Sequence, residues 1–246
     1  MADSVAAMDY TAHFAATEAA LDAYRGALGS GPLDARVPTC PEFDLAALTK
    51  HVGEFCGFWT HVVCEGTGRE KSPFPDFPSG ASAVPEWFDG LANQLVRVLR
   101  DTSPDTACWT WVPDRQDVAF VGRRTAHELS IHRYDAQVAV GATEAIDAET
   151  AADGIDEIFV MHAAWEQSKN GSGETIHLHA AEGNEWMITL SPGGMVVDRS
   201  HGKADVALRG AVSDIELKLF GRPTIGAVEV LGDPEALAAW YRAFTF

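Results

Sequence analysis

The chain lacks the features of secreted, membrane-spanning and disulfide-stapled proteins. Its 246 residues include four cysteines and no C-x-x-C pair, which argues against a disulfide framework and against a thiolate zinc knot. No apolar run approaches the roughly 18 residues of a membrane span. Acidic residues also stand near the N-terminus, where a signal peptide would carry positive charge. We therefore expect a soluble cytoplasmic protein with no membrane partner.

Basic residues are also scarce. Lys and Arg number 18 against 36 Asp and Glu, which gives a formal net charge of -18. Such a chain repels phosphate backbones, so nucleic acid is excluded as a partner. The acids are dispersed, as on a solvated surface. Apolar residues make up 46% of the chain, enough for the core of one large or two modest domains.

The first part of the chain has the apolar periodicity of helices. Asp44 is suited to cap the second of them, and Gly141 to end the fourth. Long connections separate the four segments, so we predict a four-helix bundle, a fold that builds metal sites from inward-facing side chains. The predicted segments are about Tyr10 to Leu28, Leu45 through Trp59, about Val84 to Arg100 and roughly Val118 to Val140.

After a further helix, predicted from about Ala148 to Trp165, the periodicity changes. Four segments alternate apolar and polar residues between turns, as in an antiparallel sheet. A helix, a strand and a closing helix capped by Asp233 follow. The pattern predicts an α+β protein with two domains, a helical bundle over residues 1–168 and a smaller α/β domain with a mainly antiparallel sheet over residues 169–246, with the boundary near Ser168.

Glu128 and His132 are the best candidates for chemistry in the bundle. Four residues apart on a helix, they lie one turn apart on the same face, where one cation can bind both. His51, on the apolar stripe of the second predicted helix, is the candidate third ligand. The alternative interpretation is that His51 is a core histidine bonded to a neighbour. Three such ligands leave one coordination position open, as in catalytic sites. Zinc suits the set, although manganese, iron or nickel also fit.

Asp135 follows His132 by three residues, which leaves two interpretations open. The carboxylate orients the ligand histidine from behind. Alternatively, it forms a surface ion pair, for example with Arg133.

Several segments resemble the mycothiol-dependent maleylpyruvate isomerase family of actinobacteria. They are CPEFDLAALTKHV, RRTAHELSIHRYDAQ, LKLFGRP and VEVLGD. The resemblance implies a DinB-like helical bundle followed by a sterol-carrier-like domain. The family's metal-binding histidine follows a C-P-x-[WF] turn, and its Glu and His lie four apart in one helix. On this chain these positions are His51, Glu128 and His132.

The resemblance adds Arg222, which follows Gly221 where the isomerase has an arginine required for turnover. A guanidinium at such a junction can hold a carboxylate through two parallel hydrogen bonds. The alternative is a structural arginine that bridges the two domains.

The implied function is thiol chemistry at a divalent metal, with mycothiol as thiol cosubstrate. In the implied reaction, the thiolate adds to an activated electrophile and isomerises a maleylpyruvate-like compound from cis to trans. Three alternatives stay open: a mycothiol S-transferase that forms a stable conjugate, a non-catalytic protein that binds a small ligand, and metal-assisted hydrolysis. We expect as partners a small electrophile and a low-molecular-weight thiol, and as assembly a monomer or homodimer.

Overall fold

A computed structural model describes residues 8–67, 76–163 and 171–244 of the chain. These residues form two compact units, the first over Met8–Glu144 and the second from Ala145 onward. The first unit is helical, and the second combines helices with a mainly antiparallel sheet, so the α+β class is confirmed. In the described part of the chain, no helix has both the length and the apolar character that a membrane crossing requires.

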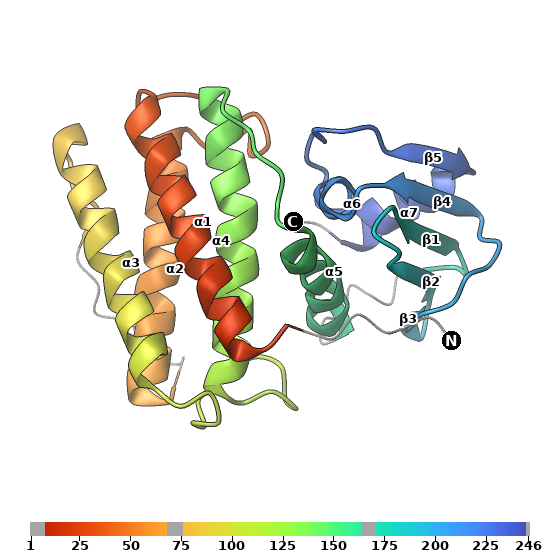
Figure 1. The fold of residues 1–246 in the computed structure, drawn as a ribbon, viewed down its shortest axis with the longest axis horizontal. Helices are drawn as coiled ribbons and strands as arrows, with labels where there is room; N and C mark the ends of the chain where they lie inside the picture. The colour runs from red at the N-terminus through yellow and green to blue at the C-terminus, as the bar shows by residue number, and fades with distance from the viewer. Residues whose placement is uncertain (1–7, 68–75, 164–170, 245–246) are drawn as a thin grey trace. The chain divides into compact units, whose positions relative to one another are not determined.

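The first unit is a four-helix bundle (Figure 1). Helix α1 packs chiefly against α4, and α2 packs chiefly against α3, while α2 also contacts α4. A short 3-10 turn, Ala81–Ala83, precedes α3. The helices are α1 (Tyr10–Ser30), α2 (Leu45–Glu65), α3 (Val84–Asp101) and α4 (Val118–Val140).

Aspartates fix the start of three of these helices. The side chains of Asp9, Asp44 and Asp117 each accept a hydrogen bond of 2.8 Å from the backbone N–H three residues on. Each bond satisfies a helical N–H that has no partner inside the helix. Gly66 and Gly141 follow α2 and α4 with φ of 72° and 73°, the left-handed conformation that glycine adopts most easily. The capping aspartates and the glycines that follow thus fix where α2 and α4, the helices with the candidate ligands, begin and end.

The bundle core holds large aromatic side chains and one close helix contact. Tyr24 and Trp59 are almost completely buried, and the Tyr24 hydroxyl lies 3.1 Å from Oγ1 of Thr49. At Gly53 of α2, an added Cβ would lie 2.2 Å from the Trp87 ring of α3. The absence of a side chain at Gly53 therefore lets α2 and α3 approach each other.

The second unit is built on a five-stranded sheet in the order β3-β2-β1-β4-β5. Neighbouring strands run antiparallel except β1 and β4, which are parallel. Helices α5, α6 and α7 belong to the same unit and contact strands of this sheet (Figure 1). The elements are α5 (Ala148–Ala163), β1 (Thr175–Ala180), β2 (Glu185–Ser191), β3 (Gly194–Asp198), β4 (Val206–Gly210), α6 (Val212–Leu219), β5 (Glu229–Gly232) and α7 (Pro234–Ala243).

The division between the units differs from the expected one near Ser168, a residue that lies outside the described ranges. Helix α5, expected with the bundle, groups with the second unit, so the division falls between Glu144 and Ala145. The physical reason is that α5 packs against α6 and β3. The connection into α5 is fixed as well, because the N–H of Ile146 donates to Oγ of Ser213 at 2.9 Å.

Candidate metal centre

Three side chains converge from α2 and α4. His51 comes from α2, while Glu128 and His132 lie one turn apart on α4. Nε2 of His51 is 3.4 Å from Oε1 of Glu128, and Nε2 of His132 is 3.2 Å from the same oxygen. The two imidazole rings lie edge to face, with centroids 4.9 Å apart. The structure therefore brings together the three residues selected as candidate ligands.

Asp135 orients His132 from behind. Its carboxylate is fully buried, and Oδ2 lies 3.0 Å from Nδ1 of His132. When Nδ1 donates a hydrogen bond to an ionised Asp135 carboxylate, a neutral His132 ring keeps its lone pair on Nε2, the nitrogen that faces Glu128. Of the two interpretations of Asp135, the geometry matches the orienting carboxylate and not the surface pair.

The turn before α2 supports both histidines. Cys40 and Phe43 belong to the C-P-E-F turn, which is closed by a 2.8 Å hydrogen bond from the Phe43 N–H to the Cys40 carbonyl. Sγ of Cys40 donates to Oδ2 of Asp135 at 3.6 Å. The Phe43 ring packs against His51, with ring centroids 5.9 Å apart. One short turn thus contacts a candidate ligand from α2, His51, and Asp135, the partner of a candidate ligand from α4.

Arg124 belongs to the site although sequence reasoning did not single it out. Its guanidinium forms an ion pair with Oε2 of Glu128, which leaves Oε1 facing the histidines. Arg124 lies four residues before Glu128, so the i,i+4 spacing that pairs Glu128 with His132 was a signal that could have found it. This ion pair holds the Glu128 carboxylate in one orientation.

The imidazole of His51 is held in its neutral form. Partial burial, followed by the nearby His132 and Arg124, lowers the pKa of His51 to about 4. The pKa of His51 is lowered although 43% of its side chain is exposed. A neutral ring has a lone pair for a metal ion, so protons do not compete strongly for this nitrogen near neutral pH.

The donor set fits a divalent cation. Donor atoms about 2.0–2.1 Å from a tetrahedral ion lie about 3.4 Å apart, and the contacts to Oε1 of Glu128 are 3.4 and 3.2 Å. A neutral His132 directs a lone pair at a carboxylate oxygen, an arrangement that is repulsive unless a proton or a cation lies between the two atoms. Two imidazoles and one carboxylate suit zinc and leave one position for another ligand.

Arg222, the candidate catalytic arginine, belongs to the second unit. It follows α6 and the turn residue Gly221, whose φ of 70° favours glycine. Nη1 of Arg222 donates to the Phe220 carbonyl at 2.8 Å, and the guanidinium lies 5.9 Å from the centre of the Phe220 ring. The side chain is half-buried. These contacts fix the first part of the loop after α6.

Comparison with known proteins places the bundle in a family. The family model of the mycothiol maleylpyruvate isomerase N-terminal domain matches residues 14–137, half of the chain, which include all of α2 and α4 up to Gln137. Two similar crystal structures are of the mycothiol-dependent maleylpyruvate isomerase, one of them with a histidine replaced by alanine. Each has 14% sequence identity and a TM-score of 0.64, and the match covers 91% of this chain and 93% of that one.

At this identity the structural likeness is one of fold. Among proteins with curated functions, none matches the chain in sequence. The family model nevertheless spans the C-P-E-F turn, His51, Glu128 and His132. The chain therefore belongs to the family defined by the mycothiol maleylpyruvate isomerase N-terminal domain.

Proposed function

We propose that the protein is a metal-dependent enzyme that adds the thiolate of mycothiol to an activated electrophile, with cis-trans isomerisation of a maleylpyruvate-like compound as its reaction. The observation that carries this proposal is the convergence of His51, Glu128 and His132 within the matched domain, with Asp135 behind His132. All four cysteines are free, as suits a thiol-dependent enzyme of the reducing cytoplasm.

In this proposal His51, Glu128 and His132 hold a divalent ion, with zinc preferred. Such an ion would supply a lower pKa for an incoming thiol, so that it reacts as the thiolate. The chain's own residues prepare that position. Asp135 keeps Nε2 of His132 directed at it, and Arg124 holds Glu128 so that one oxygen faces the histidines.

The reaction needs a second group that holds the substrate. Addition of the thiolate to the cis double bond places negative charge on the neighbouring carbonyl oxygen, rotation follows about the new single bond, and elimination of the thiolate gives the trans isomer. We assign Arg222, from a second unit of sterol-carrier-like type, to the substrate carboxylate, where a guanidinium can form two hydrogen bonds and stabilise the developing enolate charge.

The decisive experiment follows the fate of the thiol. Metal-free protein is loaded with zinc and given mycothiol, then maleylpyruvate or a generic alkylating electrophile in separate reactions. We expect trans product with no net loss of thiol. A stable conjugate would instead assign the protein as a mycothiol S-transferase. Product formed without mycothiol would favour hydrolysis or another route. If the protein reacts with neither compound, only ligand binding remains as its function.

Matched variants separate the site from the rest of the bundle. His132→Ala removes a ligand and should abolish turnover, while His61→Ala changes a histidine of α2 outside the triad and should retain it. Retained turnover in both His132→Ala and His51→Ala would contradict the assignment of the metal ligands.

A further inference from the structure

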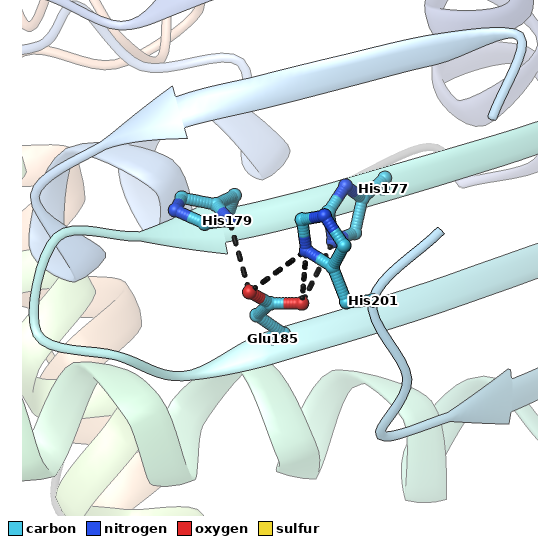
Figure 2. Close-up of side chains that lie close together, drawn as sticks. All are labelled: His177, His179, Glu185 and His201. Atoms are coloured by element: carbon cyan, nitrogen blue, oxygen red, sulfur yellow. Dashed lines mark hydrogen bonds and ion pairs between the residues drawn. The ribbon is translucent and has the colours of Figure 1, made fainter. Parts of the chain in front are cut away.

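A second group of histidines lies in the second unit and consists of residues that the proposed function does not use. His177, His179, Glu185 and His201 direct one potential ligand atom each to a common region, and these atoms all lie within 4.8 Å of one another. Figure 2 shows the three imidazole rings gathered around the single carboxylate of Glu185.

Strand geometry places three of the four residues. His177 and His179 are two residues apart on β1, so they share one face of the sheet, while Ile176 and Leu178 point to the other face and are fully buried. Glu185 on β2 pairs directly with His179 in the antiparallel register, which brings their side chains together.

The fourth residue comes from the connection between β3 and β4. His201 approaches the same face of the sheet, and 72% of its side chain is exposed. Next to it, an added Cβ on Gly202 would lie 3.3 Å from Cε of Met187, a residue of β2 that pairs with His177. The connection therefore runs close over the face that carries the other three side chains.

Each of the three imidazoles places one nitrogen close to an oxygen of the Glu185 carboxylate. Nε2 of His177 lies 3.3 Å from Oε2 of Glu185, and Nδ1 of His179 lies 3.0 Å from Oε1. Nδ1 of His201 lies 2.9 Å from Oε2. The rings meet edge to face at 73–85°, so each presents a nitrogen inward without stacking on its neighbours. Donors of a tetrahedral ion are spaced by about 3.4 Å, close to these values.

The hydrogen bonds in the group leave one donor atom unsatisfied. Nδ1 of His179 is buried and forms no hydrogen bond despite its short distance from Glu185. A buried polar atom without a partner is costly, and a cation would satisfy it.

We propose that His177, His179, Glu185 and His201 form a second metal site, a closed four-ligand centre for a divalent transition-metal ion of the zinc class. Three imidazoles and a carboxylate suit such an ion, and four protein ligands complete a tetrahedral shell. The site is therefore structural, in contrast to the three-ligand group of the bundle. It goes beyond the proposed enzymatic function and stands whether or not that function is correct.

The consequence of binding is local order in the second unit. Three of the ligands sit on paired strands, whereas His201 sits on the β3–β4 connection, so an ion would tie that connection to the sheet. Because the unfolded chain does not assemble the four ligands, binding free energy adds to the stability of the folded unit.

The test uses full-length protein without a histidine tag. In a His51→Ala/His132→Ala background, which removes the proposed bundle site, zinc is titrated against a chromophoric chelator. We expect one zinc per chain. Adding His201→Ala should weaken this binding by more than about 100-fold, since loss of an outer-shell partner alone costs about 10–100-fold. Lys203→Ala, on the same exposed connection, is the matched control and should leave affinity unchanged.

A second readout reports the ligand shell itself. Cobalt substituted into the background variant should give the intense visible absorption of a tetrahedral ion, and His179→Ala or His201→Ala should remove it. Because His201 is exposed, its replacement leaves the fold intact, which circular dichroism checks. No zinc bound in the background variant, or equal zinc affinity with and without His201, would overturn the proposal.

Discussion

At the scale of single residues, a buried carboxylate with defined partners, Asp135, helps to determine what the bundle site can do. Asp135 is fully buried and contacts both Nδ1 of His132 and Sγ of Cys40. Such a group is costly to bury unless its hydrogen bonds are satisfied. Its position behind a candidate ligand fixes the tautomer of the imidazole, so Asp135 belongs to the site without facing the open position.

Asp135→Asn should weaken zinc binding at the bundle site by about 10–100-fold while the protein remains folded. The amide keeps the size of the side chain but loses the charge that makes His132 a better donor. Competition with a chelator measures the affinity, in a His201→Ala background if the second centre also binds zinc. Asp101→Asn, at the exposed end of α3, is the control. An unchanged affinity together with a lowered melting temperature would make Asp135 purely structural.

His51 predicts a pH dependence. Its folded-state pKa of about 4 lies below the ordinary value of 6.5. Between these values the unfolded chain binds more protons than the folded one, so the contribution of His51 to stability falls as pH drops from about 6.5 towards 4. NMR titration of the metal-free protein should give a His51 midpoint far below 6.5.

The cause of that shift can be tested separately. In His132→Gln the neighbouring imidazole can no longer acquire a positive charge, so the His51 midpoint should move upward, though not fully, because the partial burial remains. A His51 midpoint near 6.5 in the unaltered protein would contradict the shift altogether.

At the scale of elements, the segments that precede α2 and α4 position the two helices that carry the candidate ligands. Asp44 and Asp117 cap α2 and α4, and each also pairs through its backbone with the segment before the helix, at Arg36 and Ala107 respectively. Each cap fixes the starting residue of its helix. The face on which His51, Glu128 and His132 emerge is therefore set by the start of the helix as well as by the apolar stripe.

Asp117→Ala should lower the free energy of unfolding by about 1 kcal/mol, the usual cost of losing an N-cap side chain. The ligands themselves are untouched, so zinc should still bind. Urea denaturation of the metal-free protein measures the effect. Asp114→Ala, three residues earlier and exposed, should change stability by less than about 0.5 kcal/mol. Equal effects of the two substitutions would show that the cap does not stabilise α4.

At the scale of the whole molecule, the proposed chemistry is divided between two units. The candidate metal ligands belong to the bundle, and Arg222 belongs to the unit that begins at Ala145. Each unit has its own buried apolar residues, for example Trp59 in the first and Trp240 in the second. Metal binding and substrate anchoring should therefore be separable by mutation.

Arg222→Gln should lower kcat/KM for maleylpyruvate by about 100-fold or more, the cost of removing a donor that stabilises developing charge. Zinc affinity should not change, since no bundle residue is altered. Arg222→Lys keeps the charge without the bidentate geometry and should recover only part of the activity. Arg209→Gln, exposed on β4, is the control. If Arg222→Gln retains full activity, Arg222 is a structural residue of the loop after α6.

The sequence determined what depends on neighbours along the chain. Apolar residues at helical spacing, together with Asp44, Asp117 and Gly141, set the helices of the bundle, and alternation set the strands. The spacing of Glu128 and His132 placed both on one face of α4, because residues i and i+4 are adjacent in a helix. These relations need no knowledge of how distant segments pack.

Only the tertiary structure decided relations between distant segments. Because α2 packs on α4, His51 lies next to Glu128. The same packing places Cys40 of the C-P-E-F turn in contact with Asp135. Strand register set Glu185 opposite His179, while the β3–β4 connection delivered His201. Such contacts depend on register and helix packing, which the free energy of the whole core selects and no local pattern encodes. For that reason the sequence could name the three candidate ligands of the first cluster but not their distances, and it did not indicate the second cluster.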